Sequence, residues 1–446
     1  MSVLVNRYNW NALDAQARAR ILERPAVTAN PETVAGVRRI VADVRANGDK
    51  ALRALTKQLD GVELDEFRVS DAEIRAAREA LTDEQITALR TATANVTAYH
   101  EAQDNAPVSV ETSDGVLCER IVRPIQAVGL YVPAGTAPLP STAIMLAVPS
   151  RLADCPLRVM CTPPRPDGRA DPAVLVAASE CGITEIYKLG GAQAVAAMAY
   201  GTETVPKVDK LFGPGNIWVT AAKTEVAADP GGAALDMPAG PTEVLIIADS
   251  KAAPRAVALD LLSQAEHGTD SQVVLITTSE TLADATAAEI DAALPDLSRR
   301  AIMEQSMQHS RVIFVEDIDA AVAVSNEYAP EHLIMQVGNA RDWLTQVTNA
   351  GSVFLGAWTP ESVGDYCSGT NHVLPTYGYA RAYSGLSVCD FQKRLSVQEL
   401  TEGGLRGLQP TVSTLARLEG LDAHARAVEV RIEDLDAAVG KKAAGS

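Results

Sequence analysis

Short apolar runs rich in β-branched residues alternate with alanine-rich segments over most of this chain, and the alternation restricts its fold more than any other feature. In the first series, which begins near residue 128, the runs are VGLYV, LRVMC, TEIYKL and DKLF. In the second series they are TEVLIIAD, SQVVLITT, RVIFV, HLIMQV and GSVFLG. Strands that alternate with helices form parallel sheets. We therefore expect an α/β protein with two parallel sheets.

The remaining segments indicate where these sheets begin and end. Glycine and proline concentrate in ADPGGAALDMPAGP, residues 228–241, and this predicts the boundary between the two sheets. The first hundred residues indicate helices, with capping-box patterns that start at Ser70 and Thr82. After residue 386 the sheet signal disappears, and FQKRLSVQELT and two short helical patterns remain. Small helical or tail segments are therefore expected beside the sheets.

Composition argues against several classes of protein. A chain of 446 residues, 47% of them hydrophobic, can bury large cores and is expected to form two or more domains. Its formal net charge of −18 argues against nucleic acid or an anionic membrane surface as a partner. Six cysteines without a CxxC pair argue against a disulfide framework or a zinc knuckle. Because no signal peptide or membrane helix is evident in the sequence, we expect a cytoplasmic protein.

Polar residues interrupt the apolar stretch LLSQAEHGTDSQVVLIT, residues 261–277. The helix expected over 252–266 ends at Gly268, so Gln264 and His267 lie in its last turn and share a face. In a doubly wound protein a helix end beside a sheet edge can form a wall of a ligand crevice. The alternative is structural, with His267 capping the exposed carbonyl groups of the helix.

A carboxylate and an imidazole stand side by side in PEHL, as Glu331 and His332. They could form an acid–base pair, because imidazole titrates near neutral pH and a partly desolvated carboxylate can accept a proton. Consecutive residues of a regular strand point to opposite faces, so both can serve one site only where the backbone is irregular. A structural pair is the alternative.

Residues 356–386, GAWTPESVGDYCSGTNHVLPTYGYARAYSGL, show little periodicity, and a long irregular stretch in a compact protein is usually functional. Asp365 offers an anionic oxygen there, although Asp is also a common turn residue. Imidazole, carboxylate and amide oxygen together suit zinc in an open catalytic site. The neighbouring Cys367 is interpreted as a packing residue rather than a nucleophile, because nothing near it in sequence lowers the pKa of its thiol.

Two glycine-rich turns lie in the first series, at 188–201 and 211–223. Each follows a strand and begins a helix, which exposes backbone amides that bind anions. Neither contains GxGxxG, and GxxxxGK[ST] is also missing. A ligand that carries phosphate and a simple tight connection both remain open.

Several motifs in order resemble those of histidinol dehydrogenases: FGPGN, AGPTEVLIIAD, LLSQAEHGTDSQ, PEHL, PESVGDYCSGTNHVLPT, SVQELT and EGLDAHARAV. The resemblance extends from the first helices to about residue 430. It implies two Rossmann-like parallel-sheet domains in an intertwined homodimer. It also implies oxidation of L-histidinol through L-histidinal to L-histidine, a four-electron reaction that uses two NAD molecules and completes histidine biosynthesis.

The resemblance assigns roles to individual residues by motif. It implies two bases, Glu331 and His332. One zinc per subunit would be held by Gln264, His267, Asp365 and His424. Substrate would be bound by Thr242, Gln264, His267, His332, Asp365, Glu419 and His424. NAD would contact Tyr131, Gln193 and Asn216. Thr242 departs from the serine that is frequent in the family, keeping the hydroxyl but adding a methyl group.

The same resemblance implies a division of the chain and a shared active site. Residues 1–25 with 387–412 would form an N-terminal arm and dimerisation segment, and residues 413–446 a tail that contributes Glu419 and His424 to the partner's site. Residues 26–130 with 243–386 would form the larger α/β domain, and residues 131–242 the smaller NAD domain. Two other classes stay open: a zinc-dependent hydrolase, and a noncatalytic protein that binds a metal or ligand.

Overall fold

The computed structural model describes residues 4, 6–24, 31–103, 105–134, 137–238 and 240–444. The chain forms two compact units. The first comprises Met1–Gln103 and Ile125–Phe391, and the second comprises Asp104–Pro124 and Gln392–Ser446. None of the helices in the described ranges combines the length and the apolar character needed to cross a membrane.

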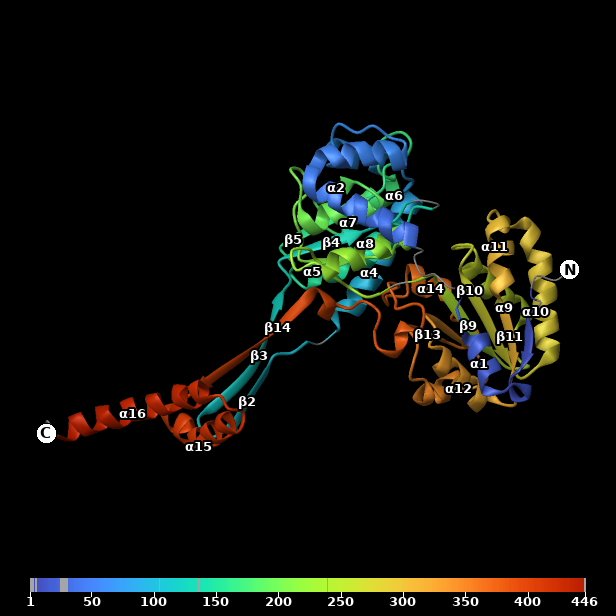
Figure 1. The fold of residues 1–446 in the computed structure, drawn as a ribbon. Coiled ribbons are helices and arrows are strands. Elements are labelled where there is room, and N and C mark those ends of the chain that lie inside the picture. The colour runs from blue at the N-terminus through green and yellow to red at the C-terminus, as the bar shows by residue number, and fades with distance from the viewer. Residues whose placement is uncertain are drawn as a thin grey trace. The chain divides into compact units, whose positions relative to one another are not determined.

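The first unit contains a six-stranded, fully parallel sheet that confirms the second series of apolar runs (Figure 1). Its order is β1 (Arg7–Asn9), β11 (Arg311–Phe314), β10 (Gln272–Thr277), β9 (Glu243–Ala248), β12 (His332–Gln336) and β13 (Ser352–Leu355). Strand β1 was not predicted. It has three residues, lies at the sheet edge and buries none of them fully, so it carries no apolar signal.

Alternate residues of β9 pack on opposite faces of this sheet. Val244 and Ile246 belong to one hydrophobic cluster, and Leu245 and Ile247 belong to another. Both faces are therefore covered, as the continuous apolar runs of parallel strands require. The helices that contribute to the two clusters are α9 (Pro254–Ala265) and α10 (Glu280–Ala293) on one face, and α1 (Ala15–Leu22) and α12 (Ile318–Tyr328) on the other.

The amino ends of β9 and β12 are adjacent, because the two strands pair directly and in parallel. Thr242 precedes β9, and His332 is the first residue of β12. Helix α9 runs back between the parallel strands β9 and β10, so its last turn with Gln264 lies at the amino end of the sheet. This is the end opposite to the one that binds ligands in most open α/β sheets.

The first unit also contains a five-stranded parallel sheet that confirms the first series of runs. Its order is β6 (Glu185–Lys188), β5 (Leu157–Thr162), β4 (Ala127–Tyr131), β7 (Lys210–Phe212) and β8 (Ala234–Leu235). Its helices are α5 (Pro140–Leu152), α6 (Pro172–Glu180), α7 (Gly191–Tyr200) and α8 (Ile217–Ala228). The boundary between the two sheets falls between β8, which lies inside the expected stretch 228–241, and β9, which begins at Glu243 just after it.

The N-terminal helices are α2 (Pro31–Leu55), α3 (Asp71–Glu79) and α4 (Asp83–Glu101). Both predicted capping boxes are present, at Ser70 and Thr82. Val37, Val41 and Val44 form a buried stripe on α2 that belongs to the same hydrophobic cluster as α7 and α8. The structure thus packs α2 on the five-stranded sheet, whereas we expected residues 26–130 beside the larger one. A helical stripe predicts burial but does not identify the sheet that it meets.

The second unit contains a three-stranded antiparallel sheet with the order β14 (Gln392–Leu400), β3 (Val116–Pro124) and β2 (Val108–Ser113). The prediction that the sheet signal ends at residue 386 was therefore wrong for β14. Most of its residues are exposed, so no apolar pattern marks it as a strand. The two helical patterns that follow are confirmed as α15 (Glu402–Leu418) and α16 (Asp422–Ala444), which pack against each other.

Candidate active site

A cavity of about 170 Å³ lies at the amino ends of β9 and β12. Its lining brings together residues that are far apart in sequence, including five of the expected site residues. These five are Thr242, His267, Glu331, His332 and Asp365. The loop after β7, with Gly213 and Gly215, and the start of α5 also line it.

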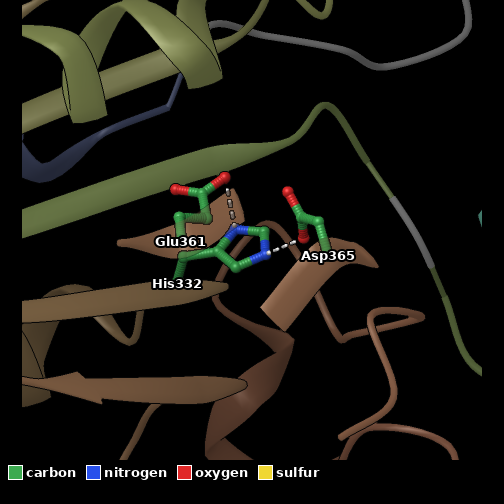
Figure 2. Close-up of side chains that lie close together, drawn as sticks. All are labelled: His332, Glu361 and Asp365. Atoms are coloured by element: carbon green, nitrogen blue, oxygen red, sulfur yellow. Dashed lines mark ion pairs between the residues drawn. The ribbon is translucent and has the colours of Figure 1, made fainter. Parts of the chain in front are cut away.

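His332 is the centre of a buried charged cluster (Figure 2). Its Nδ1 atom contacts the backbone oxygen of Glu243 at 3.1 Å and lies 3.7 Å from carboxylate oxygens of both Glu331 and Glu361. Its Nε2 atom is 3.6 Å from Asp365 Oδ1 and forms no hydrogen bond within the described residues. One imidazole nitrogen is thus fixed by the backbone, and the other is available to a ligand.

Glu331 occupies the turn just before β12, where the backbone is irregular as the acid–base reading requires. Ala329, two residues earlier, has a φ of 56° in the left-handed region. The Glu331 carboxylate accepts hydrogen bonds from the Thr242 hydroxyl at 2.6 Å and from the backbone N–H of Glu243 at 2.9 Å. Burial raises the pKa of Glu331 to about 7, although the nearby His332 opposes the rise. Such a group can exchange protons near neutral pH.

Glu361 and Asp365 come from the short helix α14 (Glu361–Tyr366), inside the stretch that was predicted to be irregular. They are four residues apart, so both project from the same face of the helix. Ligand atoms of His332, Glu361 and Asp365 all lie within 4.8 Å of one another, a separation that could hold a metal ion (Figure 2). Glu361 was missed. The one signal for it in the sequence is its position four residues before Asp365.

The three carboxylates and the imidazole shift one another's pKa values. Burial by itself lowers the pKa of His332, but the charges of Glu361 and Glu331 outweigh it and hold that pKa well above its usual value. Burial raises the pKa of Glu361 well above the ordinary range. Burial also acts to raise the pKa of Asp365, yet interaction with His332 brings it below normal. The cluster therefore shares protons rather than ionising fully.

Gln264 is fully buried at the end of α9, and its amide lies between the Thr242 hydroxyl and the Glu361 carboxylate. With the amide oriented so that both of its ends are satisfied, Gln264 Nε2 donates to the Glu361 carboxylate, and Oε1 faces the Thr242 hydroxyl and the backbone N–H of Glu243, the latter at 3.2 Å. Gln264 thus joins Thr242 to Glu361, and a half-turn of its amide would bring the oxygen to the Glu361 side.

The other expected residues occupy two different places. His267 lies just beyond α9, where desolvation lowers the pKa of its imidazole, and it lines the cavity together with Asp365. Glu419 and His424 are exposed residues of the second unit, at the end of α15 and in the first turn of α16. His372 lines the same cavity as His267 and was not predicted. Its Nδ1 contacts the backbone oxygen of Asp365 at 2.7 Å.

Tyr131, Gln193 and Asn216, the expected cofactor contacts, line a second cavity of about 530 Å³. The Tyr131 hydroxyl accepts a hydrogen bond from the backbone N–H of Gly191 at 3.0 Å. Asn216 caps α8 by accepting from the backbone N–H of Trp218 at 3.0 Å. Leu139 and His267 line both cavities, so the two adjoin.

The fold and the site together define a class of protein. It is an α/β enzyme whose buried imidazole–carboxylate cluster can move protons, next to a second cavity that is large enough for a cofactor. A model of the histidinol dehydrogenase family matches residues 22–432. The chain belongs to the histidinol dehydrogenase family.

Individual relatives agree with this assignment. The chain is 56% identical over 424 residues to a histidinol dehydrogenase of Xanthomonas euvesicatoria pv. vesicatoria, which covers 95% of this chain and 98% of the relative. It is 53% identical over 426 residues to one from Aliivibrio fischeri, with 96% of each covered. The crystal structure of histidinol dehydrogenase from Elizabethkingia anophelis superposes with a TM-score of 0.93 at 44% identity, over 98% of this chain and 99% of that one.

Proposed function

We propose that this chain is an NAD-dependent histidinol dehydrogenase that converts L-histidinol through L-histidinal to L-histidine, the last steps of histidine biosynthesis. The observation that carries the proposal is the family match over residues 22–432, in a chain whose Glu331 and His332 are both buried in one cavity. A reaction that ends histidine biosynthesis is consistent with a cytoplasmic location.

His332 acts as the general base of both oxidations. It accepts the alcohol proton while hydride leaves the carbinol carbon, and later it accepts a proton from the aldehyde hydrate while the second hydride leaves. NAD, when bound, supplies the hydride acceptor in each step. The unpartnered Nε2 atom of His332 is the group that can accept these protons. A cation bound at the neighbouring carboxylates would lower the raised pKa of His332, so that its imidazole could be neutral and accept a proton.

Glu331 acts on water. L-Histidinal becomes the hydrate when a water oxygen bonds to the carbonyl carbon. Glu331 accepts the proton that the water loses, and the carbonyl oxygen takes up the proton that His332 gained in the first oxidation. Its carboxylate is oriented by the Thr242 hydroxyl and the Glu243 backbone N–H. A pKa near 7 suits a group that must accept this proton and release it in each turnover. Thr242 orients Glu331 and Gln264, and we propose that it also contacts substrate.

One Zn²⁺ per subunit would be held by Gln264, His267 and Asp365, with His424 of the partner subunit. The donor set fits zinc, because it combines imidazole nitrogen with carboxylate and amide oxygens. The ligand atoms of His332, Glu361 and Asp365, all within 4.8 Å of one another, also favour a cation at this position. When bound, the ion would orient the substrate and hold it in place through both oxidations. The same ligand residues, with Glu419 of the partner subunit, would contact substrate.

The protein is proposed to act as a homodimer, in which residues 1–25 and 387–412 contribute to dimerisation and residues 413–446 complete the partner's site. Exposure of Glu419 and His424 supports this, since both are free to reach another chain. Mixing an inactive Glu331→Gln/His332→Gln variant with an inactive His424→Gln variant tests it. Activity should reappear after subunit exchange, and merely additive residual rates would refute a shared site.

The stoichiometry of NADH tests the reaction itself. Two NADH formed for each L-histidinol consumed is the expected result. One NADH would indicate an ordinary alcohol dehydrogenase. Loss of substrate without NADH would indicate the alternative zinc-dependent hydrolase, and binding without turnover a noncatalytic protein. Metal analysis of the same preparation should give about one zinc per chain.

A further inference from the structure

The second cavity lies over the carboxyl ends of the five-stranded sheet. Its lining residues Tyr131, Pro163, Gly191 and Asn216 end or follow four successive strands of the sheet, β4, β5, β6 and β7. The residues near the amino ends of α7 and α8 also line it, so backbone N–H groups and two positive helix ends face its interior. The cavity is thus suited to a ligand with phosphate groups, and its volume suits a dinucleotide.

The carboxylate of Asp60 also lines this cavity, although the helix amino ends that line it attract anions. Asp60 is the last residue of a single π-helical turn, Thr56–Asp60, that follows α2. π-Helical turns are rare and frequently occur at functional sites. Gln193 Nε2 donates to Asp60 Oδ2 at 3.2 Å, and Gln193 itself is buried. Across the described residues, no donor contacts the other oxygen of Asp60.

Apolar side chains flank Asp60 and remain exposed in the free protein. Leu59 is 51% exposed and Trp218 is 39% exposed, and both line the cavity together with Ile40. The Trp218 ring packs against α2 at Gly36, where a Cβ atom would lie 2.7 Å from the indole. The flat indole of Trp218 and two aliphatic side chains at a cavity that also holds a carboxylate match an adenosine, whose base packs on them while its ribose offers two hydroxyl donors.

Cations are scarce in this cavity. Arg299 is the single Lys or Arg side chain that lines it within the described ranges. Arg299 lies near His267, since its charge acts on the pKa of that imidazole, and so marks the end that adjoins the first cavity. The end of the cavity near Asp60 therefore has a carboxylate that can accept hydrogen bonds from hydroxyl groups. It has no lining Lys or Arg side chain, among the described residues, that could neutralise a phosphate.

We infer that Asp60 selects NAD over its 2′-phosphorylated counterpart, by accepting hydrogen bonds from the ribose hydroxyls of the adenosine half. The inference rests on the proposed function, in which the second cavity binds the cofactor. A carboxylate binds a vicinal diol through two O–H···O⁻ bonds. A 2′-phosphate removes one of these donors and brings like charge against Asp60. Gln193, which the resemblance assigned to the cofactor, then acts by orienting Asp60.

Equilibrium binding of NAD and NADP to the full-length protein, measured by calorimetry, tests this inference. Asp60→Asn keeps an oxygen that accepts from Gln193 and removes only the charge. It should weaken NAD binding by about 10- to 100-fold, the range for a lost hydrogen bond to a charged group. NADP binding should stay the same or improve, so the preference for NAD falls by at least about tenfold. Asp65→Asn, an exposed carboxylate on the following segment, is the matched control and should change neither affinity.

Turnover supplies a second readout. At saturating NAD the kcat of Asp60→Asn should stay within about twofold of the parent while its KM for NAD rises, as expected for loss of a binding contact remote from the reacting atoms. An unchanged ratio of NAD to NADP affinity in Asp60→Asn would overturn the inference. If the parent yields two NADH per L-histidinol, such a result leaves the proposed function intact. If the parent yields none, the proposed function fails, and calorimetry still reports which dinucleotide Asp60 favours.

Discussion

Arg24 forms a buried, bidentate ion pair with Glu243, with Nε 2.6 Å from Oε2 and Nη2 2.9 Å from Oε1. The backbone of Glu243 in turn contacts the Glu331 carboxylate through its N–H group and His332 Nδ1 through its oxygen. Arg24 also donates to the backbone oxygen of Ala329, which has a left-handed conformation. One guanidinium therefore fixes both the strand and the turn that present the acid–base pair.

Replacement of Arg24 by methionine should destabilise the fold. The change leaves the buried Glu243 carboxylate without a cation, with the Tyr328 hydroxyl as a remaining donor, so the free energy of unfolding should fall by about 3–5 kcal/mol. Urea denaturation at pH 7.5 measures it, with the exposed Arg20→Met as the control. The double variant Arg24→Met/Glu243→Gln should recover much of the loss, because no buried charge remains. A loss below about 1 kcal/mol in Arg24→Met would contradict a structural role for the pair.

Replacement of Glu331 by glutamine separates the two oxidations. Glutamine keeps an oxygen that accepts from Thr242 and Glu243 but cannot take a proton from water. We expect oxidation of added L-histidinal to slow by about 100-fold or more, and the first NADH from L-histidinol to form less than about tenfold more slowly. His332→Gln should slow both reactions, and the exposed Glu327→Gln neither. Equal slowing of both steps in Glu331→Gln would show that Glu331 does not act on the hydrate alone.

Replacement of Gln264 by glutamate tests the amide oxygen as a ligand. The new carboxylate would face Glu361, so like charges repel unless a cation lies between them. The variant should keep its metal but lose turnover, because substrate is oriented differently. Its melting temperature should fall more in the metal-free form, prepared with a chelator, than in the zinc-loaded form. The exposed Gln305→Glu serves as the control. Equal loss of metal content and turnover would count against an orienting role.

Apolar alternation was sufficient to predict the two parallel sheets, because both faces of each sheet are covered and the central strands β9 and β10 are buried along their whole length. It was insufficient for β1 and β14, whose residues are mostly exposed or only partly buried. Tertiary pairing rather than local burial defines these strands. The sequence pattern also could not predict which sheet α2 packs on, since an apolar stripe on a helix fits either sheet equally well.

The prediction of the candidate site rested more on sequence motifs than on the periodicity of apolar residues. Spacing placed Gln264 and His267 on one helix end and suggested that Glu331 and His332 need an irregular backbone, which the left-handed Ala329 provides. Thr242 contacts Glu331 because the amino ends of β9 and β12 are adjacent. The sequence pattern could not predict this contact, since it does not give the order of the strands in the sheet. Glu361 was missed because a lone glutamate in a polar stretch resembles any exposed carboxylate.

A further buried acid lies on α9, near Glu361. Asp260 is 7% exposed, and its one hydrogen-bond donor among the described residues is Gln336 Nε2 at 3.4 Å. Burial raises the pKa of Asp260 to about 6, and the Gln336 contact opposes this only in part. The unfolded chain has a value near 3.9. The folded state therefore binds this proton more tightly than the unfolded state does.

The sign of the resulting pH dependence follows from linkage. A raised pKa in the folded state gives stability that is complete below about pH 4 and is lost as the pH rises through about 6. Asp260→Asn removes the ionisation, so at pH 8 it should raise the free energy of unfolding by up to about 3 kcal/mol, and at pH 5 by about half as much. Urea denaturation at pH 5, 6.5 and 8 measures the difference, with Asp65→Asn as the exposed control. A gain that is the same at every pH would mean that Asp260 does not carry this charge in the folded protein.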